Sequence, residues 1–268
     1  MSDPQIEHWN GAGGARWAAA HERIDAHFAA ITDALFAFAA PRTGERCLDV
    51  GCGTAATTRE LHRRTGAHAV GIDVSAQLVA IARARVPEAS FVLADAATHA
   101  LAPDFELAFS RFGVMFFADP VAAFANIRRA LAPGGRLAFA CWRAVVANAW
   151  AAVPLAVARP LLPPQPPADP LAPGPFAFAD ATRVHDVLAA AGFRDVAVTP
   201  FDTAAPFGAT VDDAAAEMLA IGPVARQAAE LDADTRAEIA RRIAAAFAPF
   251  ATSAGVRLPA AVWLVGAR

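Results

Sequence analysis

At 268 residues, with 56% hydrophobic and 18% charged side chains, the chain has enough apolar material for one large domain and too few charges for a disordered protein. Its formal net charge is −3 and its arginines are scattered, which argues against a nucleic-acid partner. The chain contains no tyrosine and no lysine, so a Schiff-base lysine, a phosphate-loop lysine and a Tyr–Lys reductase pair are all excluded.

The first forty residues are expected to form an N-terminal helical lid. Within residues 15–40 the apolar side chains recur at helical spacing, which predicts an amphipathic helix. Trp9 and Trp17 flank the stretch NGAGG, which is expected to be a glycine-rich turn in this lid. The N-terminus lacks the basic start and apolar run of a secretory signal, and no apolar run predicts a membrane span. We therefore expect a cytoplasmic protein without a membrane partner.

Residues 41–143 alternate between short apolar runs and amphipathic stretches. Strands are expected at 46–51, 68–75, 89–96, 105–114 and 136–143, and helices at 57–66, 75–88 and 119–135. This alternation predicts an α/β fold with a doubly wound parallel sheet, covered by helices on both faces.

The pattern loosens after residue 143. A proline-dense stretch at 159–175 predicts an ordered cover loop over 144–180, because proline disfavours both helix and central strand. A helix at 180–193 leads to a strand at 194–202, and a helical insertion over 208–251 precedes a last strand at 257–268. The two late strands complete a seven-stranded sheet with an antiparallel end, so 1–268 is expected to be a single domain.

The stretch CLDVGCGTAATT, which begins at Cys47, predicts a nucleotide-like site. Gly51 and Gly53 let the backbone turn tightly between a strand and a helix whose N-terminus favours negative charge. Asp73 and Asp95 stand at the ends of the next two expected strands. A carboxylate at the position of Asp73 can accept both hydroxyls of a ribose.

The glycine spacing alone leaves a dinucleotide or S-adenosylmethionine open as the ligand, since Gly51-x-Gly53-x-x-Ala56 satisfies the dinucleotide fingerprint. Asp49, two residues before the first glycine, favours S-adenosylmethionine. A carboxylate there is unfavourable beside a pyrophosphate and favourable beside the ammonium group of a methionine.

Four stretches resemble the class I S-adenosylmethionine-dependent methyltransferases, the bacterial small-molecule group that includes UbiE-like and Methyltransf_11/25-type enzymes. They are LDVGCGT, GIDVS, LADA and SRFGVMFFADPVAAFANIRRALAPGGRLAFACWR. These stretches are spread over residues 45–143, within the expected cofactor-binding core at 41–143. The resemblance implies the strand order 3-2-1-4-5-7-6 with strand seven antiparallel. Many relatives have a further glycine where this chain has Ala55.

The resemblance also implies roles for individual residues. Asp49, Gly51, Cys52, Gly53 and Thr54 are expected near the methionine part of S-adenosylmethionine, and Asp73 at its ribose. The adenine is expected against Val74, Leu78, Asp95 and Ala96, and the methyl group against Ser110 and Arg111. Trp9 and Trp17 are expected to close over the cofactor, whose product would be S-adenosyl-L-homocysteine.

The acceptor side is expected to be apolar, because aromatic side chains are frequent in the cover elements and after the fourth strand. Phe112, Met115, Trp142 and Phe176 are the candidate pocket residues. His8 and His21 are the candidate general bases, because they lie in the expected lid. His21 and His27 do not share a helical face, so no metal site is expected.

These features favour a methyltransferase that acts on O, N or C of a small, largely apolar metabolite, as a monomer or homodimer. Cys47 and Cys141 lie inside expected strands, which argues against cysteine-dependent arsenic methylation. The alternatives are a fold relative that uses S-adenosylmethionine for other chemistry, such as cyclisation of the cofactor, or a non-catalytic binding protein. A nicotinamide-dependent oxidoreductase is a more distant alternative.

Overall fold

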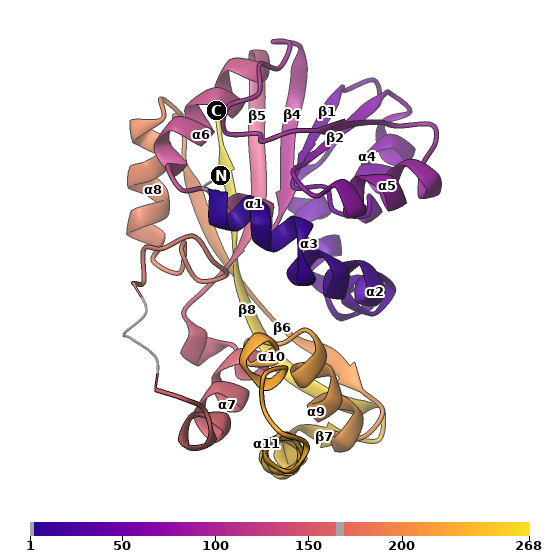
Figure 1. The fold of residues 1–268 in the computed structure, drawn as a ribbon. Coiled ribbons are helices and arrows are strands. Elements are labelled where there is room, and N and C mark those ends of the chain that lie inside the picture. Colours follow the sequence, from indigo (N-terminus) through magenta and orange to yellow (C-terminus); the bar gives the residue numbers. More distant parts are fainter. Residues whose placement is uncertain (1–2, 165–168) are drawn as a thin grey trace.

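The computed structural model, which describes residues 3–164 and 169–268, contains a central mixed sheet of eight strands (Figure 1). The strand order is β3-β2-β1-β4-β5-β8-β6, with β7 paired to β8 alone. β8 occupies the place that the prediction gave to strand seven, between β5 and β6, and runs antiparallel to both. The predicted fold class and strand order are therefore confirmed. The strands are β1 (Cys47–Val50), β2 (Ala69–Asp73), β3 (Ser90–Leu93), β4 (Phe105–Arg111), β5 (Leu131–Trp142), β6 (Ala197–Gly208), β7 (Ala251–Thr252) and β8 (Gly255–Ala267).

Helices cover both faces of the sheet. The chain moves outward in one direction from β1 through α4 (Ala56–Thr65) to β2, and in the other direction from β4 through α6 (Pro120–Ala130) to β5. Because parallel crossovers are right-handed, these two helices lie on opposite faces. α5 (Ala76–Arg85) packs on β2 and β3, and α8 (Ala181–Ala190) packs beside α6. The four residues of β1 are therefore all buried.

Side-chain caps define where several of these helices begin. The hydroxyl oxygen of Ser75 accepts a hydrogen bond from the Leu78 amide at 3.4 Å and so caps the start of α5. Asp119 caps α6 by accepting from the Ala122 amide at 3.0 Å. Each cap satisfies an amide that has no partner inside its helix, so both helix starts are encoded locally.

The N-terminal segment forms three helices, not the one that the periodicity predicts. They are α1 (Asp3–Asn10), α2 (Ala12–His27) and α3 (Ala29–Ala39). The expected glycine-rich turn is shorter than predicted: Gly11 forms a turn between α1 and α2, whereas Gly13 and Gly14 lie inside α2. A side chain on Gly14 would place its Cβ 1.9 Å from the Trp9 carbonyl oxygen, so this glycine allows α1 and α2 to cross closely.

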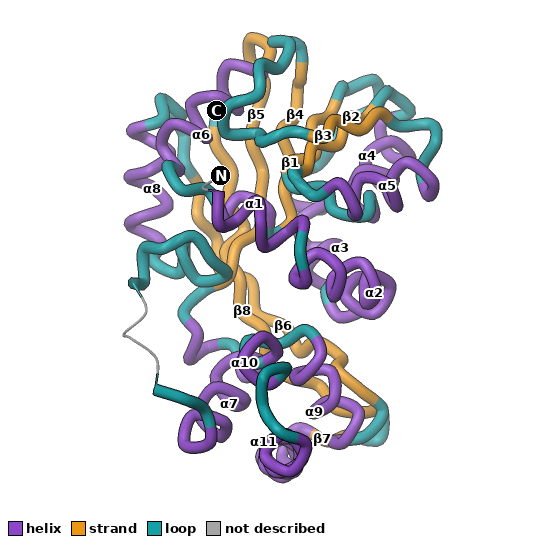
Figure 2. Tube along the Cα trace, viewed as in Figure 1, coloured by secondary structure: helices purple, strands orange, loops and turns teal. Residues whose placement is uncertain are grey.

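A second group of elements, which we call the cap, extends from one edge of the sheet. β5 pairs with β8 only from Val262 to Ala267, whereas β6 continues along β8 to Val256 (Figure 2). The two strands thus leave the sheet as a ribbon, and helices gather around its outer half (Figure 1). The cap helices are α7 (Ala149–Ala158), α9 (Val211–Ala220), α10 (Ala225–Ala228) and α11 (Ala233–Phe247).

The expected cover loop over 144–180 is partly helical, because α7 and two short 3₁₀ turns lie within it. Part of its proline-dense stretch, residues 165–168, falls outside the described residues. The 3₁₀ turns of the chain are Gly113–Phe116, Val145–Ala147, Arg159–Leu161 and Ala248–Phe250. Among the described helices, none has the length and apolar character that a membrane span requires.

Candidate functional site

A cavity of about 240 Å³ lies at the carboxyl ends of β1, β2 and β4, between the sheet, the N-terminal helices and the cap. The strand order reverses its direction between β1 and β4, and ligands of open α/β sheets bind at such a point. The sheet side of the cavity is lined by Val50, Gly51, Gly53, Ile72, Asp73, Val74, Leu78, Ala94, Asp95, Ala96, Arg111, Phe112 and Gly113. The cover side is lined by Trp9, Trp17, Ile24, His27, Phe28, Met115, Phe116, Phe117, Trp142, Trp150, Pro175, Phe176, Phe207, Met218, Ile221, Gly222 and Pro223.

The loop after β1 needs glycine at Gly51. Its φ is +69°, and a Cβ there would lie 2.7 Å from the Cα of Gly113 in the neighbouring loop. Gly53 also has a positive φ, at +54°. Ala55, which caps the start of α4, adopts the same left-handed conformation with φ +71°, at some cost for a residue with a Cβ. The loop therefore brings bare backbone to the edge of the cavity.

Asp73 ends β2 and faces the cavity. Its carboxylate accepts hydrogen bonds from the amides of Gly53 at 2.8 Å and Ser75 at 2.9 Å. Burial raises its pKa, while these amide donors act in the opposite direction. Each carboxylate oxygen keeps a second lone pair, so Asp73 can accept further hydrogen bonds from a ligand.

Asp49 lies one layer deeper, with no part of its side chain exposed and outside the cavity lining. Its Oδ2 accepts hydrogen bonds from the hydroxyls of Thr57 and Thr58, both at 2.7 Å, and its Oδ1 is buried without a protein partner. Burial raises its pKa to about 6, although the threonine hydroxyls oppose the shift.

The raised pKa of Asp49 predicts a pH-dependent stability. The folded protein holds this proton up to about pH 6 and the unfolded chain only up to about pH 4, so the free energy of unfolding falls between these values. Above pH 6 the accumulated loss is about 3 kcal/mol. Asp49→Asn keeps an acceptor for both threonines and removes the titration. Between pH 4 and pH 6, urea unfolding should therefore show the free energy of unfolding of the variant rising relative to that of the wild type. A difference that does not change with pH would contradict the raised pKa of Asp49.

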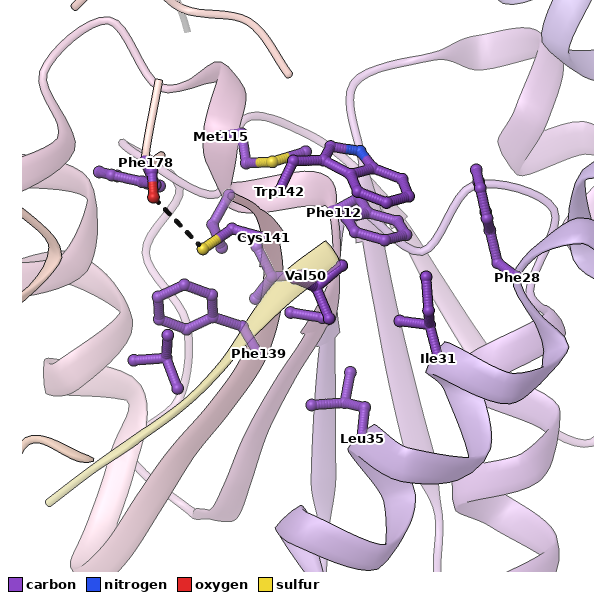
Figure 3. Packing of buried hydrophobic residues seen from close by; sticks show 14 of the residues in the cluster. Phe28, Ile31, Leu35, Val50, Phe112, Met115, Phe139, Cys141, Trp142 and Phe178 are labelled. Carbon is purple, nitrogen blue, oxygen red and sulfur yellow. Dashed lines mark hydrogen bonds between the residues drawn. The ribbon is translucent and has the colours of Figure 1, made fainter. Parts of the chain in front are cut away.

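An aromatic wall occupies the cavity side away from Asp73. The rings of Phe112 and Trp142 stack in parallel, with centroids 4.3 Å apart, and Phe28 meets both edge-on (Figure 3). Trp150 packs on Trp142 at 4.8 Å and Phe176 on Trp150 at 6.0 Å. Phe112 has φ +70°, an uncommon conformation for a bulky residue, and this backbone turns its ring under Trp142. The wall offers an extended apolar surface to a ligand.

Comparisons with known proteins agree with this arrangement. Residues 48–139 match the sequence family described as methyltransferase domain. The chain is 39% identical over 94 residues to trans-aconitate 2-methyltransferase of Acidovorax sp. strain JS42, which covers 34% of this chain and 36% of that protein. It is 35% identical over 107 residues to aklanonic acid methyltransferase DauC of Streptomyces sp. strain C5, covering 37% and 49%. The matches thus span between a third and a half of these relatives.

Solved structures extend the likeness to the whole fold. Phosphoethanolamine N-methyltransferase 2 of Haemonchus contortus, solved with S-adenosyl-L-methionine, superposes with a TM-score of 0.54 at 16% identity, over 88% of this chain and 51% of that one. The YcgJ protein of Bacillus subtilis gives 0.56 at 15%, over 88% and 97%. The chain therefore has the fold of these two solved structures, and residues 48–139 match a methyltransferase domain in sequence.

Several predicted site residues do not line the cavity. The Cys52 thiol packs with Ala55 and Val79 in a separate apolar cluster, and the Thr54 hydroxyl accepts a hydrogen bond from Arg85 at 2.9 Å. The Ser110 hydroxyl is fully buried and donates to the Val50 carbonyl at 2.7 Å. These side chains brace the loop that carries the glycines, and face away from the ligand space.

The two predicted bases also lie outside the lining. The His8 ring sits beside Gly13, where partial burial and the charges of Arg16 and Arg226 lower its pKa. The His21 Nδ1 is 2.7 Å from the Ala18 carbonyl oxygen of its own helix. Among the described residues, the histidine that does line the cavity is His27, which pairs with Glu217 in the cap. No local signal marks this pair, because its members are 190 positions apart.

Arg111 lines the cavity as predicted, but its guanidinium is held by other groups. It donates to Asp25 at 2.7 Å and to the Thr32 hydroxyl at 2.9 Å. Asp25 lies 3.8 Å from Arg85 as well. These ion pairs fasten the N-terminal helices to β4 and α5.

The first helix clasps the loop that follows Asp73. The Asn10 amide nitrogen donates to the Val74 carbonyl and its amide oxygen accepts from the Ala76 amide, both at 3.0 Å. Gln77 and Ser75 return hydrogen bonds to the carbonyls of Asn10 and Trp9, each at 2.7 Å. Trp9 in turn packs edge-on against Trp17 and Phe116 over the cavity.

Removing this clasp should weaken ligand binding without unfolding the protein. Asn10 is exposed, so Asn10→Ala is expected to leave the melting temperature within a few degrees and to lower the affinity for S-adenosylhomocysteine about tenfold, through the loss of two hydrogen bonds. Asn10→Asp, which keeps only the acceptor for Ala76, should lose at least as much because its charge faces the Val74 carbonyl. Calorimetry gives both affinities, and equal affinity in the wild type and both variants would contradict a role for the clasp.

Proposed function

We propose that this chain is an S-adenosylmethionine-dependent methyltransferase whose acceptor is a small, largely apolar molecule. The observation that carries the proposal is the position of Asp73, a carboxylate at the end of β2 that faces the same cavity as Gly51 and Gly53. The two hydroxyls of a ribose need hydrogen-bond acceptors, and the methionine part beside it needs backbone that it can approach closely. At this edge of the sheet Asp73 offers the acceptors, and Gly51 and Gly53 offer the backbone.

The described residues fit the cofactor along its length. Asp73 would accept the ribose hydroxyls, and the glycine loop would take the methionine part. Val74 and Leu78 would flank the adenine, with Asp95 and Ala96 at its edge. The partnerless Oδ1 of Asp49, directly below the loop, fits a positive group on the ligand side of that loop.

When bound, the cofactor supplies an electrophilic methyl carbon whose leaving group is a neutral thioether. The protein therefore has to align the acceptor in line with that carbon and exclude water. Trp9 and Trp17 close the cavity over the loop, and the aromatic wall of Phe112 and Trp142 would orient an apolar acceptor. Since His8 and His21 lie outside the lining, we propose that an acceptor reacts through an atom that is nucleophilic without their help.

The acceptor atom (O, N or C) is part of the proposal and is open to test. Incubation with S-adenosylmethionine labelled in the methyl group, and a panel of apolar acceptors, should give labelled product. Calorimetry of the same protein should show micromolar binding of S-adenosylhomocysteine and none of NAD. Binding of NAD instead would overturn the proposal in favour of an oxidoreductase.

One alternative has a structural observation behind it. The cyclase SpnF shares this fold with a TM-score of 0.53 at 21% identity, over 89% of this chain and 80% of that one, so the fold alone does not require methyl transfer. Consumption of the cofactor without labelled acceptor would favour other chemistry. Binding without any turnover would favour a binding protein.

A further inference from the structure

A charged cluster joins the N-terminal cover to the cap at the wall of the cavity. His27 ends α2, and its ring lines the cavity while being only 8% exposed. Its Nε2 lies 2.9 Å from a carboxylate oxygen of Glu217 on α9, and its Nδ1 lies 2.6 Å from the Pro206 carbonyl oxygen of β6. Arg23, one turn earlier on α2, donates to the same carboxylate at 3.1 Å.

The hydrogen-bond partners fix the charge of the His27 ring. A backbone carbonyl only accepts, so Nδ1 must donate to Pro206. Burial raises the pKa of Glu217, but the hydrogen bond from His27 and the charge of Arg23 outweigh it and the pKa is lowered. An ionised carboxylate also only accepts, so Nε2 donates as well and the ring is an imidazolium. The cluster of His27, Arg23 and Glu217 thus has two positive charges and one negative charge.

Within this cluster, the positive charge closest to the cavity belongs to the His27 ring. The other two members are not among the lining residues, and the Arg23 side chain is 55% exposed. Phe207 stacks on one face of the ring, with the centroids 4.6 Å apart. Ile24 on α2 and Met218 on α9, which are close to the His27–Glu217 pair in the chain, add apolar side chains to the cavity lining. In such surroundings a fixed cation attracts an anion more strongly than it would in water, and no vacant N–H is needed for this attraction.

We propose that the cavity selects a flat apolar acceptor that carries a carboxylate, with the His27 imidazolium facing the carboxylate and the Phe112–Trp142 wall holding the apolar part. The inference deepens the proposed function and rests on it. In this arrangement His27 is a binding residue that sets specificity, and it is not a general base, because both of its nitrogens already donate to acceptors.

Two probes of the same shape and different charge test this inference. In calorimetry with S-adenosylhomocysteine present, 2-naphthoate should bind the wild type at least about tenfold more tightly than 2-naphthamide, as expected for a unit charge near a partly buried cation. His27→Gln should lose this preference for the acid while its affinity for 2-naphthamide stays within about twofold. His185→Gln, at a side chain that is 59% exposed on α8, is the matched control and should keep it.

The outcomes separate this inference from the proposed function. Equal affinities of the wild type for the two probes, or binding of neither while S-adenosylhomocysteine binds, would overturn the carboxylate site. A preference for 2-naphthoate that remains in His27→Gln would also overturn it. Failure of S-adenosylhomocysteine itself to bind the wild type would instead count against the proposed function. Equal affinities of the wild type for the two probes would overturn the inference even if His27→Gln does not fold.

Discussion

Replacing Asp73 by alanine is expected to lower the affinity for S-adenosylhomocysteine about 100-fold or more. The proposed contact is a pair of hydrogen bonds from ribose hydroxyls to an ionised carboxylate, and each such bond contributes about 1.5–3 kcal/mol. Asp73→Asn keeps one acceptor oxygen and loses the charge, so it should fall between the wild type and Asp73→Ala. Calorimetry with the purified proteins gives all three dissociation constants.

Asp73 also braces the loop, and this second role has to be separated from the first. Its carboxylate accepts hydrogen bonds from the Gly53 and Ser75 amides, so Asp73→Ala leaves two amides to find other partners. The thermal midpoints of the variants therefore have to be measured beside their affinities. Asp186→Ala, at a side chain that is 73% exposed, serves as the control. Unchanged affinity in a folded Asp73→Ala protein would show that the ribose is not held here.

The sheet side of the cavity could be predicted because its signals are local. The spacing from Gly51 to Asp73 spans one strand–helix–strand unit, and the sheet brings the ends of neighbouring parallel strands together wherever that unit forms. Asp73, Val74, Asp95 and Ala96 therefore line one cavity, as their places at strand ends predict. Cys52 and Ser110 have neighbouring places in the chain, but their side chains point into packed regions, and sequence position does not reveal this direction.

The predicted pocket residues Phe112, Met115, Trp142 and Phe176 also line the cavity. The charged contacts on the cover side could not be predicted, because they join distant segments. The His27–Glu217 pair forms only when α2 and α9 both pack on β6, and neither residue stands in a recognisable motif. Gly14 illustrates the same limit at short range. Glycine pairs usually mark turns, but here the missing side chain lets two helices cross, and the close contact with Trp9 is a tertiary feature.

Comparing Gly51 with Gly44, whose backbone conformation is similar, distinguishes the cost of backbone strain from the cost of close packing in the loop after β1. Gly51 has φ +69° and Gly44 has φ +85°, so alanine at either position is expected to cost about 1 kcal/mol for its left-handed conformation alone. Around Gly44 an added Cβ meets no atom within 4 Å. At Gly51 it would lie 2.7 Å from the Gly113 Cα, and neither loop can move without disturbing the Ser110 hydrogen bonds to Val50 and Gly113.

Gly51→Ala should therefore lower the free energy of unfolding by about 3 kcal/mol or more, against about 1 kcal/mol for Gly44→Ala. Urea unfolding at one pH measures both values. Because any shift in the loop displaces the backbone that would meet the methionine part of the cofactor, Gly51→Ala should also bind S-adenosylhomocysteine at least about tenfold more weakly, while Gly44→Ala binds it normally. Equal losses of stability in the two variants would mean that the contact between the loops yields easily, and the requirement for glycine at Gly51 would then be one of backbone conformation alone.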